Sequence, residues 1–128
     1  MCLNTVDKET RQAKEGYKAV QTTRMGLSSV CRGNGRTLPV GVWLDESLYA
    51  DSRGVGYIHA WEDGEEGVTC GEYPRGWHSY LTEEDAWNCG LCFDAVVKVK
   101  IKEVLASGIQ WERAVVVSRF IKIVEVLK

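Results

Sequence analysis

Two β-branched runs near the end of the chain decide the fold: FDAVVKVKIKEVLA at residues 93–106 and AVVVSRFIKIVEVL at residues 114–127. In the first run, valine and isoleucine alternate with three lysines, which is the period-two pattern of a strand with one buried face. The second run has the same preference for β-branched residues, and SGIQWER separates the two. We therefore predict two long strands that pair antiparallel through a loop of about seven or eight residues.

The segment GWHSYLTEEDAW, residues 76–87, indicates a strand followed directly by a helix. One face would carry Trp77, Ser79 and Leu81 and the other His78 and Tyr80, which is a strand pattern. Thr82 then precedes three consecutive acidic residues, the last of them three positions after it. This is the pattern of a capping box, in which the threonine and the acids satisfy free backbone N–H groups. The sequence predicts a short helix that begins at Thr82 and ends before Gly90.

The rest of the chain supplies shorter elements. A first strand is expected at residues 16–22, a loop or hairpin at 24–36, and further strands near Val42–Leu44 and Gly56–Trp61. Residues 1–15 show no periodicity and are interpreted as a flexible arm before a single domain at residues 16–128. The expected fold is a small α+β domain: an antiparallel-rich sheet of about five or six strands with one short central helix.

Composition and charge restrict the function. The chain of 128 residues has a net charge of −2, no long apolar run, and five cysteines in irregular positions. These features predict a cytoplasmic protein with reduced thiols, without membrane association and without affinity for duplex nucleic acid. Both ends are basic, whereas residues 62–85 carry eight acidic residues and one basic residue. The basic ends suit a small anion, and the acidic middle suits a module that inhibits a host protein directly.

No motif indicates catalysis or metal binding. Cys89 and Cys92 form a single C-x-x-C pair at a helix end, and structural zinc sites usually need a second pair, so buried thiols are expected. Neither histidine lies in a known catalytic context, and neither G-x-G segment continues as a phosphate loop. We predict a protein that is not an enzyme and has no cofactor. Five tryptophans exceed the needs of a small core, so some are candidates for stacking on a nucleobase.

Several short motifs, in order along the chain, resemble a known family. They are MCLNT, YKAV, RMGLSS, GWHSYLTEEDA, AVVKVKI and AVVVSRFIKIVE. Together they are similar to small phage-encoded proteins, the Thoeris anti-defence sponges, which sequester cyclic ADP-ribose isomers made by bacterial TIR-domain proteins. Residues 37–70 lie outside the resemblance, and the Cys89–Cys92 pair is not a feature of that family.

The resemblance implies a homo-oligomer such as a hexamer. This assembly would bind a cyclic nucleotide between its subunits and would not cleave it. Such a ligand needs arginines for its phosphates and an aromatic face for its base. The residues carried over to ligand binding are Arg24, Gly26, Trp77, His78, Phe93, Arg113 and Arg119. The competing hypothesis is the interaction module that uses the acidic middle of the chain.

Overall fold

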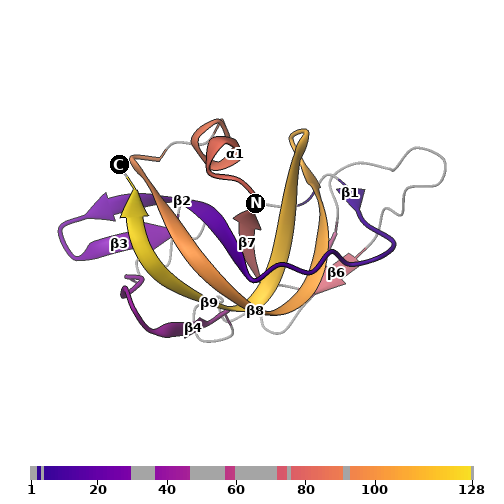
Figure 1. Ribbon diagram of the computed structural model, residues 1–128, viewed down its shortest axis with the longest axis horizontal. Helices are drawn as coiled ribbons and strands as arrows, with labels where there is room; N and C mark the ends of the chain where they lie inside the picture. The colour runs from indigo at the N-terminus through magenta and orange to yellow at the C-terminus, as the bar shows by residue number, and fades with distance from the viewer. Residues whose placement is uncertain are drawn as a thin grey trace.

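The computed structural model describes residues 3, 5–29, 37–46, 57–59, 72–74, 76–90 and 93–127. Antiparallel strands dominate it, with 62% strand and 7% helix, and the only helix in these ranges is short (Figure 1). The antiparallel-rich sheet and the single short helix are therefore confirmed. The number of strands is higher than the predicted five or six, because the main sheet has seven strands and a separate sheet has two.

The strands are β1 (Thr5–Val6), β2 (Glu15–Thr23), β3 (Gly26–Ser29), β4 (Trp43–Asp45), β5 (Tyr57–His59), β6 (Glu72–Pro74), β7 (Trp77–Tyr80), β8 (Ala95–Gln110) and β9 (Arg113–Leu127). The helix, α1, is Glu83–Trp87. β5 and β6 form the small sheet, and the other strands form the large one in the order β1-β8-β2-β7-β9-β4, with β3 beside β2. The strands predicted from the sequence all correspond to observed ones.

The β8–β9 ribbon forms the centre of the molecule, and both strands are long and strongly curved (Figure 1). The predicted loop SGIQWER is wrong, because only Trp111 and Glu112 lie outside the strands, with φ of 48° and 67°. A two-residue connection with both φ values positive matches the twist of a hairpin, although glycine or asparagine is usual there. Polar residues in SGIQWER suggested a loop, but Ser107 and Gln110 are buried strand residues.

Curvature in the ribbon closes the sheet. The pairing of β8 with β9 shifts register twice, between Lys98 and Val99 and between Val104 and Ala106. Such bulges bend a strand and increase its twist. The bent strands can consequently pair with each other and also with β2 and β7, and Tyr17 of β2 pairs with Tyr80 of β7. β8, β2, β7 and β9 thus form a closed ring of neighbouring strands.

The inside of this ring is the main hydrophobic core. Its members alternate along the strands and are nearly all fully buried: Val20, Leu38, Leu44, Trp77, Ala95, Val97, Val99, Ile101, Val116, Ile121 and Ile123. Trp77 is the largest of them, and its indole N–H donates to the Leu44 carbonyl oxygen at 3.0 Å. Alternation of apolar residues in the sequence therefore corresponds to one continuous packed interior.

A second apolar cluster covers part of the outer surface of the same strands. Val96, Val115 and Val117 point outward there and pack beneath α1, β6 and the N-terminal segment. This cover explains why the second long run begins with three consecutive valines. Both faces of β9 are buried at that point, so strict alternation with polar residues is absent.

The N-terminal segment, expected as a flexible arm over residues 1–15, contributes a strand and a core residue. β1 pairs with β8, where Val6 lies opposite Gly108, and the Leu3 side chain is 0% exposed. Arg11 N–H donates to the Ser107 hydroxyl at 2.8 Å, which ties the segment down further. The pairing spans about a hundred residues of sequence, so local periodicity gave no sign of it.

The predicted start of the helix is confirmed. Thr82 is the N-cap of α1, and its hydroxyl accepts a hydrogen bond from the backbone N–H of Asp85 at 3.2 Å. We expect Thr82→Ala to lower the free energy of unfolding by about 1 kcal/mol, the usual cost of losing such a cap. Urea unfolding would measure this change. Thr82→Ser keeps the hydroxyl and should stay close to wild type, and equal losses in both variants would contradict the capping role.

Candidate functional site

A regular array of lysines and aromatic rings lies on the outside of three neighbouring strands. Register places Trp43 of β4, Lys122 of β9 and Lys100 of β8 in one row. The next outward row contains Asp45, Phe120 and Lys102 from the same strands. Between the two rows, Leu44, Ile121 and Ile101 point inward and are buried in the core. Because strand residues alternate between faces, the two rows share one surface.

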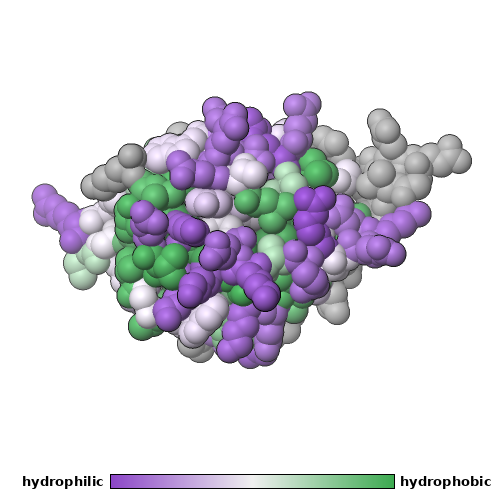
Figure 2. Space-filling model, in the orientation of Figure 1, coloured by the Kyte–Doolittle hydropathy of each residue, from purple (hydrophilic) through white to green (hydrophobic). Residues whose placement is uncertain are grey.

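We call Trp43, Lys100, Lys102, Phe120 and Lys122 the lysine–aromatic face. Its Trp43 ring is 43% exposed, and Lys100 and Lys102 are exposed as well. Hydrophilic side chains gather over β8 and β9 in the centre and along the lower edge of the molecule (Figure 2). The rigid strands beneath hold the array in place.

Cation–π contacts connect the members of the face. The Lys102 ammonium lies 5.4 Å from the ring centroid of Trp43 and 5.4 Å from that of Phe120. Lys122 approaches the Trp43 ring at 6.0 Å. Each contact contributes roughly 0.5–1 kcal/mol at an exposed position. The rings are thus partly covered by lysines that a stronger ligand can displace.

Positive charge on the face is only partly balanced within the described part of the chain, by Asp45, by Glu103 and by Glu15, which lies opposite Lys100 in β2. Lys100 and Lys122 lie directly opposite each other across β8 and β9, an arrangement that destabilises a sheet through like-charge repulsion. Among the described residues, neither of them forms an ion pair with a carboxylate, and nor does Lys102. An anion bound between these ammonium groups would relieve the repulsion.

Arg119 borders the face and is the one residue of the sequence-based set that reaches it. Its guanidinium lies 5.0 Å from the Phe120 ring centroid. It also lies 3.5 Å from a carboxylate oxygen of Asp45 and 3.9 Å from one of Glu103. Arg119 therefore offsets one of the two acidic charges at the edge, and together with the three lysines the group keeps an excess of positive charge.

Two other predicted ligand residues are buried. Trp77 is 2% exposed inside the ring of strands, with the Lys18 ammonium 5.7 Å from its ring centroid. His78 points to the opposite side of β7 and shares a 3.0 Å hydrogen bond with the hydroxyl of Tyr73. That hydroxyl also accepts a hydrogen bond from the Leu3 N–H at 2.8 Å. In this structure both side chains hold the fold together.

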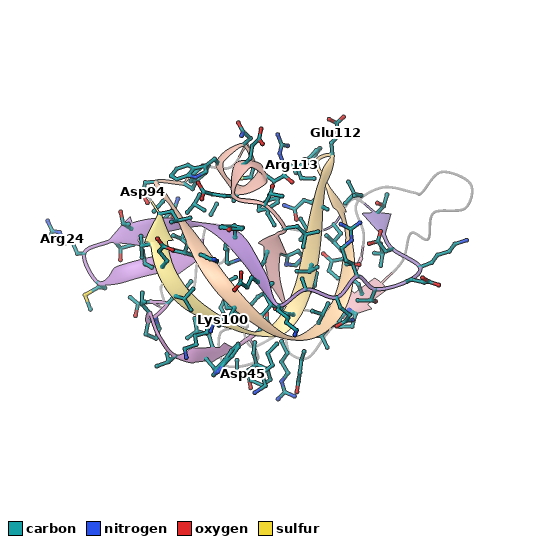
Figure 3. All side chains as sticks on the ribbon, in the orientation of Figure 1. Arg24, Asp45, Asp94, Lys100, Glu112 and Arg113 are labelled. Atoms are coloured by element: carbon teal, nitrogen blue, oxygen red, sulfur yellow. The ribbon has the colours of Figure 1, made fainter. Side chains whose placement is uncertain are left out.

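The remaining predicted residues lie apart from one another. Arg24 is exposed in the turn between β2 and β3, before Gly26 with φ of 128°, and Arg113 lies near the far end of the ribbon (Figure 3). Arg113 donates to the Trp111 carbonyl oxygen at 2.9 Å and lies 3.9 Å from a carboxylate oxygen of Asp85. Phe93 packs against Trp87, with 5.8 Å between ring centroids. One chain thus does not bring the seven residues into a single site.

Several other sequence features lie outside the described residues. Cys92 is among them, as are four of the eight acids of the run at residues 62–85, whereas Cys89 is a buried free thiol. Across the described ranges, no three side chains of histidine, cysteine, aspartate or glutamate gather as metal ligands. In those same ranges, no helix has the length and apolar character needed to cross a bilayer. The predictions about zinc and about an acidic interaction surface therefore stay predictions.

Comparison with known proteins adds no assignment, since no family model, no curated protein and no solved structure matches this chain. The lysine–aromatic face therefore rests on its own geometry.

Parts of this face were recognisable in the sequence, but their assembly was not. The alternation in KVKIK placed the β8 lysines on one side of a strand, and the excess of tryptophans marked Trp43 as available for stacking. Phe120 and Lys122 were included only as strand residues. Their alignment with Trp43 depends on the pairing of a three-residue strand with β9, for which the sequence has no local signal.

Proposed function

We propose that this protein is a phage anti-defence protein that binds and sequesters a cyclic nucleotide signal without cleaving it. The observation that carries the proposal is the lysine–aromatic face, where ammonium groups without an ion pair in the described part of the chain adjoin the exposed Trp43 ring and the half-buried Phe120 ring. A nucleotide offers the matching chemistry of anionic phosphate and flat base. The cyclic nature of the signal, a cyclic ADP-ribose isomer or a cyclic oligonucleotide, and the anti-defence role come from the resemblance to the sponges.

Stacking of a base on an aromatic ring is stronger than the cation–π contacts that the lysines make with that ring. A base stacked on an aromatic side chain contributes about 1–3 kcal/mol, against roughly 0.5–1 kcal/mol for an exposed cation–π contact. A phosphate between Lys100 and Lys122 would draw the ammonium groups toward itself and leave the Trp43 ring available to the base. Hydrogen bonds to a charged group add about 1.5–3 kcal/mol each. Sequestration needs only this binding, without an acid–base pair.

The proposal also concerns the assembly. The resemblance predicts a homo-oligomer, and a ligand held on an open face would be enclosed further by a second subunit. Arg24 and Arg113 lie far from the lysine–aromatic face within one chain, so their predicted role requires a neighbouring subunit. Size-exclusion chromatography with light scattering would measure the number of subunits.

We expect Trp43→Ala and Lys122→Ala each to weaken nucleotide binding by about 1–3 kcal/mol, because the first removes the stacking surface and the second a phosphate ligand. Isothermal titration with cyclic ADP-ribose isomers and cyclic oligonucleotides would measure the loss. Lys8→Ala is the matched control, since it removes an equal charge from an exposed position on the N-terminal segment.

Two results would contradict the proposal. One is the absence of heat with every cyclic nucleotide. The other is an equal loss of affinity in Lys8→Ala and Lys122→Ala, which would show that only net charge matters.

A further inference from the structure

We infer that the lysine–aromatic face also binds single-stranded nucleic acid, an inference that rests on the proposed nucleotide binding at this face. Every nucleotide of a single strand of nucleic acid contains a phosphate and an unpaired base. The lysines of the face can bind the phosphate, and the aromatic rings can stack on the base. The face extends across three β-strands, β4, β9 and β8. Its width distinguishes it from a site for one phosphate.

The dimensions of the face follow from its register. Neighbouring strands are about 4.8 Å apart, so a row from Trp43 through Lys122 to Lys100 spans about 10 Å. Along β8, Lys100 and Lys102 are two residues apart, which corresponds to about 6.7 Å. The array is therefore wider than a single phosphate group and narrower than a duplex.

Each row of the face has a lysine beside a ring, while Lys100 lies beside Lys122 in the first row and Asp45 beside Phe120 in the second. Trp43 is next to Lys122 in one row, and Phe120 is next to Lys102 in the other. Successive nucleotides of a strand could consequently place bases on the two rings and phosphates on the lysines between them. Proteins that bind single strands without sequence preference use this combination of cationic groove and stacking rings.

Charge supports a polyanion over a single anion. Lys100, Lys102 and Lys122 form no ion pair among the described residues. Glu15 of β2 lies opposite Lys100 in register but pairs with Lys98, and Lys100 and Lys122 face each other across β8 and β9. Lys98 extends the same column of β8 but lies 3.5 Å from a carboxylate oxygen of Glu15. The lysines of β8 and β9 without an ion pair in the described part of the chain are thus Lys100, Lys102 and Lys122.

Duplex nucleic acid does not fit this chemistry. Its bases are stacked on one another and present only their edges, so Trp43 and Phe120 would lose their partners. The net charge of −2 provides no broad basic surface for two backbones. The inference therefore agrees with the exclusion of duplex binding made from composition.

Fluorescence anisotropy with labelled thymidine oligonucleotides tests the inference. We expect an oligonucleotide of about six residues to bind more tightly than a dinucleotide, and a duplex of equal length to bind more weakly. Three neutralised phosphates predict a slope of about −2 for log affinity against log salt, or about a 20-fold loss between about 50 and about 200 mM salt.

Variants separate the two kinds of contact. Lys100→Ala with Lys122→Ala should bring the slope to about −0.7, because one lysine contact is left. Trp43→Ala should weaken binding at least five-fold and leave the slope unchanged, since stacking releases no counterions. Lys8→Ala should change neither quantity. A duplex that binds as tightly as the single strand, or a slope unaffected by the lysine pair, would overturn the inference.

The proposed function and the inference fail in different ways. Binding of a cyclic nucleotide without binding of any linear oligonucleotide would overturn the inference and leave the function in place. Binding of oligonucleotides that no cyclic nucleotide displaces would support the inference and overturn sequestration of a cyclic signal at this face.

Discussion

Gly108→Ala is expected to lower the free energy of unfolding by about 3 kcal/mol, because it removes the N-terminal segment from the sheet. A Cβ atom on Gly108 would overlap the carbonyl oxygen of Thr5 and lie 3.0 Å from Cδ1 of Leu3. Both belong to the segment that pairs with β8 and buries Leu3 completely. Exposing a buried leucine costs about 1.5–3 kcal/mol, and the segment can detach instead of distorting the sheet, which limits the loss.

Urea unfolding measures this effect, and two controls define its cause. A Cβ atom on Gly41 would meet nothing within 4 Å, so Gly41→Ala should cost only the backbone strain of its φ of 87°, about 1–2 kcal/mol. In a chain lacking residues 1–6, Gly108→Ala should have little additional effect. A full loss in that shortened chain would show that the substitution disturbs β8 itself.

Trp77→Ala is expected to cost about 3–5 kcal/mol, the range for removing a large buried aromatic side chain. The ring lies inside the closed ring of strands, and its indole N–H is hydrogen bonded to the Leu44 carbonyl oxygen. Removal leaves a cavity beside Ile121 and Val116 and takes away the donor for that carbonyl. Thermal or urea unfolding would measure the loss.

The matched variant is Trp43→Ala, which removes the same side chain from an exposed position. It should change stability by about 1–2 kcal/mol, since two exposed cation–π contacts are lost, while it weakens nucleotide binding. Should Trp77→Ala unfold the chain, Trp77→Phe keeps most of the volume and leaves the Leu44 carbonyl oxygen without its donor, at about 1–3 kcal/mol. Normal stability with lost binding in Trp77→Phe would instead support the role that the sequence assigned to Trp77.

Elements with a local chemical cause were predictable from the sequence. Alternation of apolar residues and lysines marked β8, and the acids after Thr82 marked the start of α1. Elements that depend on distant partners were not predictable. Thr5 and Val6 form a strand only because β8 lies beside them, and Ser107 and Gln110 are strand residues only because the neighbouring segments bury them.

The candidate site also has a part that was predictable from the sequence and a part that was not. Lysines at alternate positions of β8 were visible in the sequence, because one strand determines which side they share. Their juxtaposition with Trp43 depends on the register between β4 and β9, which is set by the inward packing of Leu44 on Ile121. Single arginines beside glycine or in a strand suggested ligand contacts, yet Arg113 and Arg119 are engaged in ion pairs within the chain.

The strand order has a consequence for the synthesis of the protein on the ribosome. β2 and β7 obtain most of their partners from β8 and β9, which are the last described elements in chain order. Until those two strands emerge, the earlier strands expose apolar faces and unpaired edges, a condition that favours aggregation and chaperone binding. The β8–β9 hairpin can form within microseconds once released, and the long-range pairings can then close around it. A delay in the synthesis of residues 95–127 should therefore lower the yield of folded protein more than a delay in the synthesis of residues 5–23.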